Sequence, residues 1–384
     1  MNILCISHEY PPVGGGGATA CLNISWQLAR MGHRVTILTS SFEDAPLQEE
    51  AHGVTVLRAR CKRANRDHSS FAEMLHFLFA AYRMLPGIVK RGAFDVVQVY
   101  FGIPSGPLGW FILKRWKIPY VVRLGGGDVP GTQARFEKVY RLVGPFLKHV
   151  WGSASFVVAN SQGICDRARA FSDGARFAII PNGINAEDFP RPVQVTSDDV
   201  LEVMTTARIV ERKGIQHVLR ALPELVRETD GNVRYTIIGD GPYRTEIEAL
   251  ARRLNVLQYV RITGMVDRAE VLNILSGASV FVLTSDWEGM PNVVLEAMAM
   301  GLPVVMTDCE GSAELIGDNG FVLKRSEDIP PQVAQAVLKL YRAPELARSM
   351  GVASRKLATE HFTWKKTAQL YLQLFSEIIG DAKA

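Results

Sequence analysis

Two glutamates, Glu288 and Glu296, stand eight residues apart in a segment that is broken between them by a Gly-x-Pro. An apolar, strand-like run over Val280–Thr284 precedes them, and a short helix is predicted over Val293–Met300 with Asn292 as its N-cap. At such a strand–loop–helix junction open α/β sheets bind their ligands, and the start of the helix favours phosphate. Carboxylates repel phosphate but accept paired hydrogen bonds from sugar hydroxyls. The whole segment therefore predicts a site for sugar hydroxyls beside phosphate, although either glutamate taken alone is more readily explained as a loop or helix-start charge.

A second segment supplies positive charge. Arg208 follows a strand-like run over Leu201–Ala207, and Lys213-Gly214 stands just before a helical pattern that begins at Ile215. Arg208 as a planar fork and Lys213 as a point charge could converge on a pyrophosphate. Taken alone, these residues also fit a solvated basic turn. Together with the two glutamates, they predict a site for a nucleotide diphosphate attached to a sugar.

These segments are accompanied by further motifs, namely Pro181-Asn-Gly-Ile-Asn185, Ile238-Gly-Asp-Gly-Pro242 and the glycine-rich Pro11-Pro-Val-Gly-Gly-Gly-Gly17. The combination resembles the retaining nucleotide-sugar glycosyltransferases of family GT4, over almost the whole chain. The resemblance implies an α/β fold of GT-B architecture, in which two Rossmann-like domains with parallel sheets face each other across a cleft. It also implies that residues 1–190, joined by a C-terminal helix over 365–384, bind the acceptor and that residues 191–364 bind the nucleotide-sugar donor.

The order of the predicted elements agrees with two such domains. Strands and helices alternate at βα spacing in both halves of the 384-residue chain, which predicts a doubly wound parallel sheet in each half. The polar, proline-bearing segment Arg191–Asp199 is a plausible linker between them. We see this duplication in the architecture alone, because the two halves share no repeated sequence.

The resemblance also implies which residues act. Those implied to bind the donor are Gly16, Gly17, Arg208, Lys213, Val266, Glu288, Gly289, Met290, Pro291, Asn292 and Glu296. Those implied to take part in catalysis are Glu288, Arg208, Lys213 and Asp128. In this scheme Glu288 holds secondary hydroxyls of the sugar, Glu296 holds the ribose diol, and the two cations stabilise the leaving diphosphate.

The glycine run Gly14–Gly17 lies between a predicted strand, Ile3–Ser7, and a helix predicted over Ala18–Met31. Glycine lets backbone amides approach a ligand closely, so the run predicts an anion-binding nest, although a merely flexible loop has the same composition. No Lys-Ser/Thr follows, which excludes a Walker loop, and no ribose-binding acid ends the next strand, which argues against a dinucleotide fingerprint.

One segment departs from the family pattern. Where the family often has His-Gly-x-Asp, with the histidine against the transferred sugar, this chain has Gly125 and keeps Asp128. The missing imidazole takes away a hydrogen-bonding group and leaves space. Three interpretations stay open: the donor sugar is seated differently, another side chain enters the space, or turnover is slow.

The reaction implied by the resemblance is transfer of a hexose-type sugar from a nucleotide diphosphate sugar to a hydroxyl of a glycan or lipid-linked acceptor, with retention. UDP is favoured over GDP as the carrier. No Asp-x-Asp pair occurs in the sequence, so we expect neither a metal nor another cofactor. Two alternatives remain: a catalytically silent nucleotide-sugar-binding subunit, and a GT-B nucleotide-sugar epimerase.

Basic residues gather in residues 60–91, which hold seven Lys/Arg and two Asp/Glu. Apolar residues of a helix predicted over Phe71–Val89 could line one face of it, namely Leu75, Leu78, Phe79, Tyr82, Leu85 and Val89. Such a helix fits peripheral contact with an anionic membrane, and it equally fits a core-facing helix with a wet basic side. The chain has no recognised nucleic-acid-binding motif, so no such partner is expected. Five scattered cysteines and an N-terminus unlike a signal peptide predict a cytoplasmic protein, in solution or at the inner face of the membrane.

Overall fold

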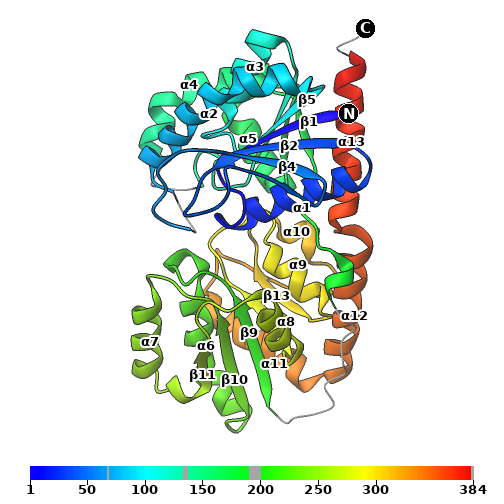
Figure 1. Cartoon of the computed structure of the whole chain (residues 1–384). Coiled ribbons are helices and arrows are strands. Elements are labelled where there is room, and N and C mark those ends of the chain that lie inside the picture. The colour runs from blue at the N-terminus through cyan, green and yellow to red at the C-terminus, as the bar shows by residue number, and fades with distance from the viewer. Residues whose placement is uncertain (67–68, 133–136, 190–199, 382–384) are drawn as a thin grey trace. The chain divides into compact units, whose positions relative to one another are not determined.

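The computed structural model describes residues 1–66, 69–132, 137–189 and 200–381. The chain divides into two compact units (Figure 1). The first unit comprises Met1–Asn182 and Trp364–Ala384, and the second comprises Gly183–Thr363. The predicted linker Arg191–Asp199 lies outside the described residues, as does the predicted boundary at residue 190.

The first unit contains an eight-stranded sheet with the order β3-β4-β2-β1-β5-β6-β7-β8. All neighbouring strands are parallel except β3, which pairs antiparallel with β4. The strands are β1 (Asn2–Ser7), β2 (Arg34–Ser40), β3 (Gln48–Ala51), β4 (Val54–Ala59), β5 (Val96–Tyr100), β6 (Tyr120–Arg123), β7 (Phe156–Ala159) and β8 (Phe177–Ile179). The helices are α1 (Gly16–Arg30), α2 (Phe71–Gly92), α3 (Gly106–Trp116), α4 (Glu137–Ser153), α5 (Gln162–Phe171) and the C-terminal α13 (Trp364–Asp381).

Side chains of this sheet alternate between two apolar cores, as the period of two in a strand requires. In β1, Leu4 and Ile6 belong to the core formed with α2, α3, α4 and α5, whereas Ile3 and Cys5 belong to the core formed with α1 and α13. Figure 1 shows α1 and α13 side by side. Tyr371 of α13 accepts a 2.5 Å hydrogen bond from the buried Arg123 of β6, which fixes the C-terminal helix on the first unit.

Helix α2 has two different sides, which corrects the single apolar face expected over Phe71–Val89. Its buried side is Met74, Phe77, Ala81, Leu85, Ile88 and Val89. Leu75, Phe79 and Tyr82 lie on the other side with Phe71, and all four are exposed. The expected face combined residues from both sides because apolar residues at helical spacing occur along two separate stripes of this helix.

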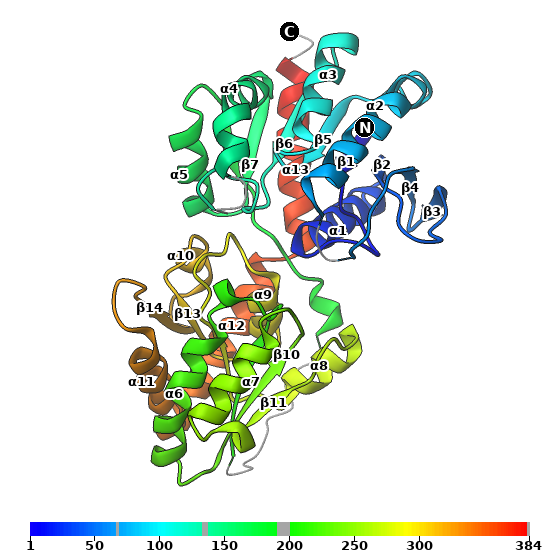
Figure 2. The same ribbon diagram turned by 90° about the vertical axis from the view of Figure 1, so that its left-hand side faces the viewer.

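The second unit contains a six-stranded, fully parallel sheet with the order β11-β10-β9-β12-β13-β14 (Figure 2). Its strands are β9 (Leu201–Thr206), β10 (Val233–Ile238), β11 (Val260–Ile262), β12 (Val280–Leu283), β13 (Val304–Thr307) and β14 (Gly320–Leu323). Its α-helices are α6 (Ile215–Glu228), α7 (Arg244–Arg253), α8 (Arg268–Ser276), α9 (Asn292–Ala299), α10 (Ser312–Leu315), α11 (Ile329–Arg342) and α12 (Pro344–His361). Helices α6, α7 and α11 cover one face of the sheet, α8 and α9 cover the other, and α12 contributes to both cores.

Each sheet has a point at which the order of its strands reverses. In the first unit this point lies between β1 and β5, and in the second it lies between β9 and β12. In open α/β sheets, ligands bind outside the carboxyl ends of the strands at such switch points. The loops that follow these four strands are therefore expected to carry the functional side chains.

Candidate functional site

The turns after β9 and β12 meet at the switch point of the second unit. Thr284 Oγ1 donates a 2.7 Å hydrogen bond to the carbonyl oxygen of Gly214. Gly214 has φ 69°, and a Cβ there would overlap the carbonyl oxygen of Thr284. Only glycine fits this position, because a side chain would be strained by the backbone and blocked by its neighbour. This close approach brings Lys213 next to the loop that carries Glu288.

Lys213 and Glu288 form an ion pair at this point, a contact that the sequence did not predict. Ser285 Oγ donates a 2.8 Å hydrogen bond to Glu288 Oε1, and the carbonyl of Ser285 in turn accepts one from Thr307 Oγ1 at 2.6 Å. Glu288 is buried, and the side chain of Lys213 is 15% exposed. A charge pair in this setting depends on both partners, since removing one leaves the other buried and uncompensated.

Arg208 lies at the same edge of the sheet, and it is exposed. The turn that carries it is fixed on the Gly-Asp-Gly-Pro segment: Ile209 N donates to the carbonyl of Asp240 at 2.9 Å, and its own carbonyl accepts from Tyr243 N at 3.0 Å. A Cβ at Gly241 would lie within 2.9 Å of the backbone of Ile209. The segment singled out in the sequence therefore supports the Arg208 turn through its backbone.

Glu296, on α9, belongs to a second charged cluster. Arg268 donates to Glu296 Oε1 at 3.1 Å through one guanidinium nitrogen and to Asp188 Oδ2 at 3.1 Å through another. Burial raises the pKa of Glu296, and the nearby Arg268 acts in the opposite direction. Sequence reasoning missed Arg268 and Asp188, because they are far from Glu296 along the chain and no motif links them.

The start of α9 differs from the prediction. The helix begins at Asn292, and its N-cap is Pro291 in an extended conformation, φ −72° and ψ 119°, so the expectation that Asn292 caps the helix was wrong. Proline has no side-chain acceptor, so no side-chain cap covers the first amides of α9. Amides of this kind at a helix start attract anions.

Met290 and Val266 of the predicted donor set belong to the same unit as this loop, whereas Gly16 and Gly17 belong to the first unit. Met290 is buried, and Val266 packs half-buried against the apolar core that includes α9. A Cβ at Gly311 would overlap the carbonyl oxygen of Gly289, so the loop is held closely by the turn after β13. The structure thus gathers Lys213, Glu288 and the helix start at one strand edge.

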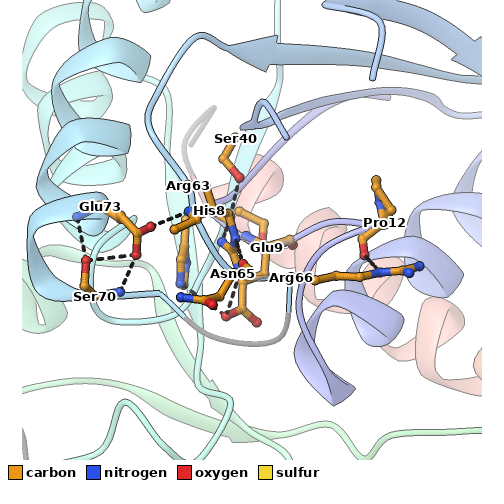
Figure 3. Close-up of polar contacts among 11 residues, drawn as sticks. His8, Glu9, Pro12, Ser40, Arg63, Asn65, Arg66, Ser70 and Glu73 are labelled. Carbon is orange, nitrogen blue, oxygen red and sulfur yellow. Dashed lines mark hydrogen bonds and ion pairs between the residues drawn. The ribbon is translucent and has the colours of Figure 1, made fainter. Parts of the chain in front are cut away.

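In the first unit, the glycine loop leads directly into α1. The helix begins at Gly16, its N-cap is Gly15, and no side-chain cap covers it. Two hydrogen bonds hold the loop to the segment after β4. Gly14 N donates to the carbonyl of Arg66 at 2.7 Å, and Arg66 Nε donates to the carbonyl of Pro12 at 2.7 Å (Figure 3).

His8, Glu9 and Arg63 form a polar cluster beside this segment, in which His8 is buried and Glu9 is half-buried (Figure 3). The carbonyl of His8 accepts hydrogen bonds from Arg63 Nη1 at 3.0 Å and from Ser40 Oγ at 2.8 Å. The Arg63 side chain is only 3% exposed and lies 3.8 Å from Glu9 Oε1. Burial, assisted by Arg63, lowers the pKa of His8 to about 3, so the imidazole is neutral at neutral pH. In the sequence Arg63 counted as one basic surface residue among several, but the structure turns it inward.

Asp128 is buried and binds two backbone amides. Its carboxylate accepts from Gly102 N at 2.7 Å and from Gly125 N at 2.8 Å, which joins the loops after β5 and β6. Burial raises the pKa of Asp128, and these backbone hydrogen bonds act in the opposite direction. The space beside Gly125 is taken by a ring, because a Cβ there would lie 2.5 Å from Cε1 of Phe101. Of the three interpretations of the missing histidine, the entry of another side chain agrees with this geometry.

Within the described part of the chain, no group of three or more His, Cys, Asp or Glu residues could hold a metal ion. Among the same residues, no helix has the length and hydrophobicity needed to cross a membrane.

Comparisons with known proteins agree on the family. Residues 15–183 match the model of the glycosyl transferase 4-like domain, and residues 201–343 match that of glycosyl transferases group 1. The chain is 27% identical to glycogen synthase of Mycobacterium tuberculosis, covering 97% of this chain and 94% of that protein. It is 24% identical to alpha-monoglucosyldiacylglycerol synthase of Acholeplasma laidlawii, covering 98% of both.

Two solved structures illustrate the fold. Sucrose-phosphate synthase from Thermosynechococcus elongatus is similar with a TM-score of 0.85 at 20% identity, covering 99% of this chain and 100% of that one. HepE from Anabaena, in complex with UDP and glucose, is similar with a TM-score of 0.77 at 19% identity, covering 98% and 99%. Two parallel-sheet, Rossmann-like halves with these neighbours establish the GT-B fold. The chain therefore belongs to the GT4-like glycosyltransferases of GT-B fold, and it is an enzyme of that class.

Proposed function

We propose that this enzyme transfers a hexose-type sugar from a nucleotide diphosphate sugar, with UDP favoured over GDP, to a hydroxyl of a glycan or lipid-linked acceptor. The anomeric configuration is retained, and no metal takes part. The complex of HepE with UDP and glucose supports UDP as the nucleotide carrier of the donor sugar. The relatives named glycogen synthase and alpha-monoglucosyldiacylglycerol synthase support the two acceptor classes.

The observation that carries this proposal is the Lys213–Glu288 pair at the switch point of the second unit. An ammonium group has three donor protons, so Lys213 can hold Glu288 with one and direct others to the diphosphate. Arg208, exposed at the same edge, adds a planar fork that matches phosphate oxygens. The positive end of the α9 helix dipole, at the helix start beside Pro291, adds further positive potential.

The two glutamates take the uncharged parts of the donor in this proposal. Glu288, positioned by Ser285, accepts hydrogen bonds from secondary hydroxyls of the sugar. Glu296, oriented by Arg268, accepts those of the ribose diol. Gly16, Gly17 and Val266 complete the donor set as backbone and apolar contacts.

Bond making and bond breaking can then proceed on one face of the sugar. The bond between the anomeric carbon and the phosphate oxygen breaks, and its electron pair stays on the diphosphate, which Arg208 and Lys213 stabilise. The acceptor oxygen forms the new bond to the anomeric carbon from the same face. The departing phosphate oxygen takes the acceptor's proton, so no side-chain base is needed.

A nucleotide-release assay tests this function. The enzyme is incubated with UDP-glucose, UDP-galactose or GDP-mannose, with and without glycan and lipid-linked acceptors, in the presence and absence of EDTA. We expect acceptor-dependent release of one nucleotide that EDTA leaves unchanged. Complete loss of release with EDTA would contradict the metal-free mechanism.

The same assay separates the two alternatives. An epimerase changes the sugar of the donor when no acceptor is present, which chromatography of the nucleotide sugars detects. A silent binding subunit raises its melting temperature with a nucleotide sugar, because binding stabilises the folded state, but releases no nucleotide with any acceptor. Either result would replace the proposed transfer.

We further propose that the first unit contacts an anionic membrane through one surface, here called the helical apolar surface. It consists of Phe71, Leu75, Phe79 and Tyr82 of α2 and Leu142 and Phe146 of α4, all exposed. Helix α3 connects the two helices, because its Phe111 ring lies 4.6 Å from Tyr82 and its Trp110 ring lies 5.7 Å from Phe146. Exposed apolar residues gathered in this way are typical of an interaction site.

Charge favours a lipid surface as the partner. Exposed basic residues occur on or beside the same three helices, namely Arg83, Lys90, Arg91, Lys114, Arg115, Lys117, Arg141 and Lys148. The α3 sequence, Gly106–Trp116, contains no acidic residue. Aromatic and apolar side chains surrounded by Lys and Arg are the pattern by which peripheral proteins bind anionic headgroups.

Vesicle sedimentation tests this surface. Phe79→Ser combined with Leu75→Ser should reduce binding to vesicles that contain phosphatidylglycerol, while wild-type binding should fall at high salt. Val352→Ser is the matched control, since Val352 of α12 is 66% exposed in the other unit. Equal sedimentation of the double variant and the control would contradict the membrane contact.

A further inference from the structure

An aromatic ring stands at the switch point of the first unit. Phe101 directly follows β5, and His8 directly follows β1; the last residues of these strands, Ser7 and Tyr100, are paired in register. The two rings lie 5.2 Å apart at 72°, edge to face. Phe101 is half-buried against the core of α1 and α13, and it lies at the edge where such sheets bind ligands.

Two glycines make room for the ring. A Cβ at Gly17 would lie 2.7 Å from Cε1 of Phe101, and one at Gly125 would lie 2.5 Å from the same atom. The glycine loop before α1 and the loop after β6 therefore both lie against the ring. Neither position accepts a side chain unless Phe101 moves.

The backbone at Phe101 is strained. Its φ of 74° lies in the left-handed region, which a bulky residue rarely adopts. The loop is held there by two hydrogen bonds: Phe101 N donates to the carbonyl of Arg123 at 3.2 Å, and Gly102 N donates to Asp128 at 2.7 Å. Asp128 also accepts a hydrogen bond from Gly125 N, so one carboxylate holds both the loop that carries Phe101 and the loop that carries Gly125. Strain kept by such support is a mark of a functional position.

We infer that Phe101 is a platform for a pyranose ring, and that Gly17, Gly125 and the carboxylate of Asp128 position it. The inference rests on the proposed function, because it requires a sugar ligand. A pyranose has an apolar face of C–H groups, and a half-exposed aromatic ring offers a matching flat surface. Phe101 thus selects for a sugar ring, belonging either to the donor or to the acceptor, and does not recognise the nucleotide.

Kinetics and binding of Phe101→Leu test the platform. Leucine keeps an apolar side chain but lacks the flat ring, so KM for one sugar substrate should rise about tenfold. A rise for the nucleotide sugar identifies the donor as the ligand, and a rise for the acceptor identifies the acceptor. The Kd of UDP alone should stay as in wild type. Phe101→Tyr, which keeps a flat ring, should have the KM of wild type. The melting temperature confirms that each variant is folded.

A second variant tests the geometry. Gly125→Ala should displace the ring and raise the same KM. The double variant with Phe101→Leu should raise KM by less than the product of the two single fold increases. The platform is overturned if Phe101→Leu keeps wild-type KM for both sugars, or if it weakens UDP alone equally. Failure of wild-type protein to bind any nucleotide sugar would instead contradict the proposed function.

Discussion

In the second unit, the turns after the two strands at the switch point meet through charge, with Lys213 paired to Glu288 and Arg208 exposed beside them. In the first unit, the equivalent turns meet through a neutral imidazole, His8, and the ring of Phe101. The two sheets share parallel doubly wound topology, yet they put opposite chemistry at the same place. A charged edge suits the diphosphate of a donor, and an aromatic edge suits the face of a sugar.

The largest expected effect is on the charged edge. Lys213→Ala removes a preorganised cation from the diphosphate, so kcat/KM should fall by about 10²–10³. Lys324→Ala is the matched control, because Lys324 pairs with Glu327 on the surface of the same unit. Steady-state kinetics with the best UDP-sugar measure both variants. A Lys213→Ala enzyme with the kcat/KM of the control would remove this residue from the diphosphate site.

Loss of the Glu296 side chain should have a smaller effect than loss of Lys213. Glu296→Ala removes charge-assisted hydrogen bonds to the ribose, worth about 1.5–3 kcal/mol of binding free energy. We expect the Kd of UDP, measured by calorimetry, to rise accordingly, with Glu327→Ala as the control for an exposed glutamate. If the Kd values of UDP and GDP are both unchanged, Glu296 does not hold the ribose.

Asp128→Asn sharpens the contrast between the two edges. Asparagine places an N–H₂ group opposite one of the two amides that Asp128 now binds, so the loops after β5 and β6 should loosen. We expect a rise of about fivefold to tenfold in KM for the sugar that Phe101 contacts, without change in the Kd of UDP. A large loss of kcat at unchanged KM would instead indicate direct action of Asp128 on the reacting atoms.

A separate prediction concerns stability and its dependence on pH. The unfolded chain binds a proton on His8 below its ordinary pKa of 6.5, but the folded state does so only near 3. Stability from the neutral His8 is therefore complete above about pH 6.5 and is lost as the pH falls toward 3. His8→Asn should flatten this dependence by up to about 1.4 kcal/mol per pH unit in the unfolding free energy of urea titrations. His149→Asn is the control, because His149 is exposed. If the unfolding free energy of His8→Asn depends on pH as steeply as that of wild type, His8 is not a buried neutral imidazole.

Much of this contrast could be predicted from the sequence. Buried strands such as Val280–Leu283, a continuous apolar run, and Val96–Tyr100, interrupted only by Gln98, are identified by their composition. The strand β3 (Gln48–Ala51) was missed, because its Gln-Glu-Glu-Ala sequence has no apolar run and none of its residues is buried. The family motifs located Lys213 and Glu288, whose direct pairing the fold then revealed.

Contacts between distant segments could not be predicted. Nothing near Arg268 indicates that it links Glu296 to Asp188, and nothing near Arg63 indicates that it turns onto the carbonyl of His8. Phe101 is one aromatic residue among many in the sequence. Its importance appears only when the fold places two glycines against its ring.

The most direct test of the central claim is the affinity for a UDP-sugar, measured by calorimetry. A double variant, Lys213→Met with Glu288→Gln, removes the charge pair without leaving one partner uncompensated. The control is Lys324→Met with Glu327→Gln, which removes an exposed Lys–Glu pair of the same unit. We predict that the first variant binds at least about 100-fold more weakly than wild type, about 2.7 kcal/mol, and that the control binds normally. Equal affinity of both variants and wild type would contradict the account.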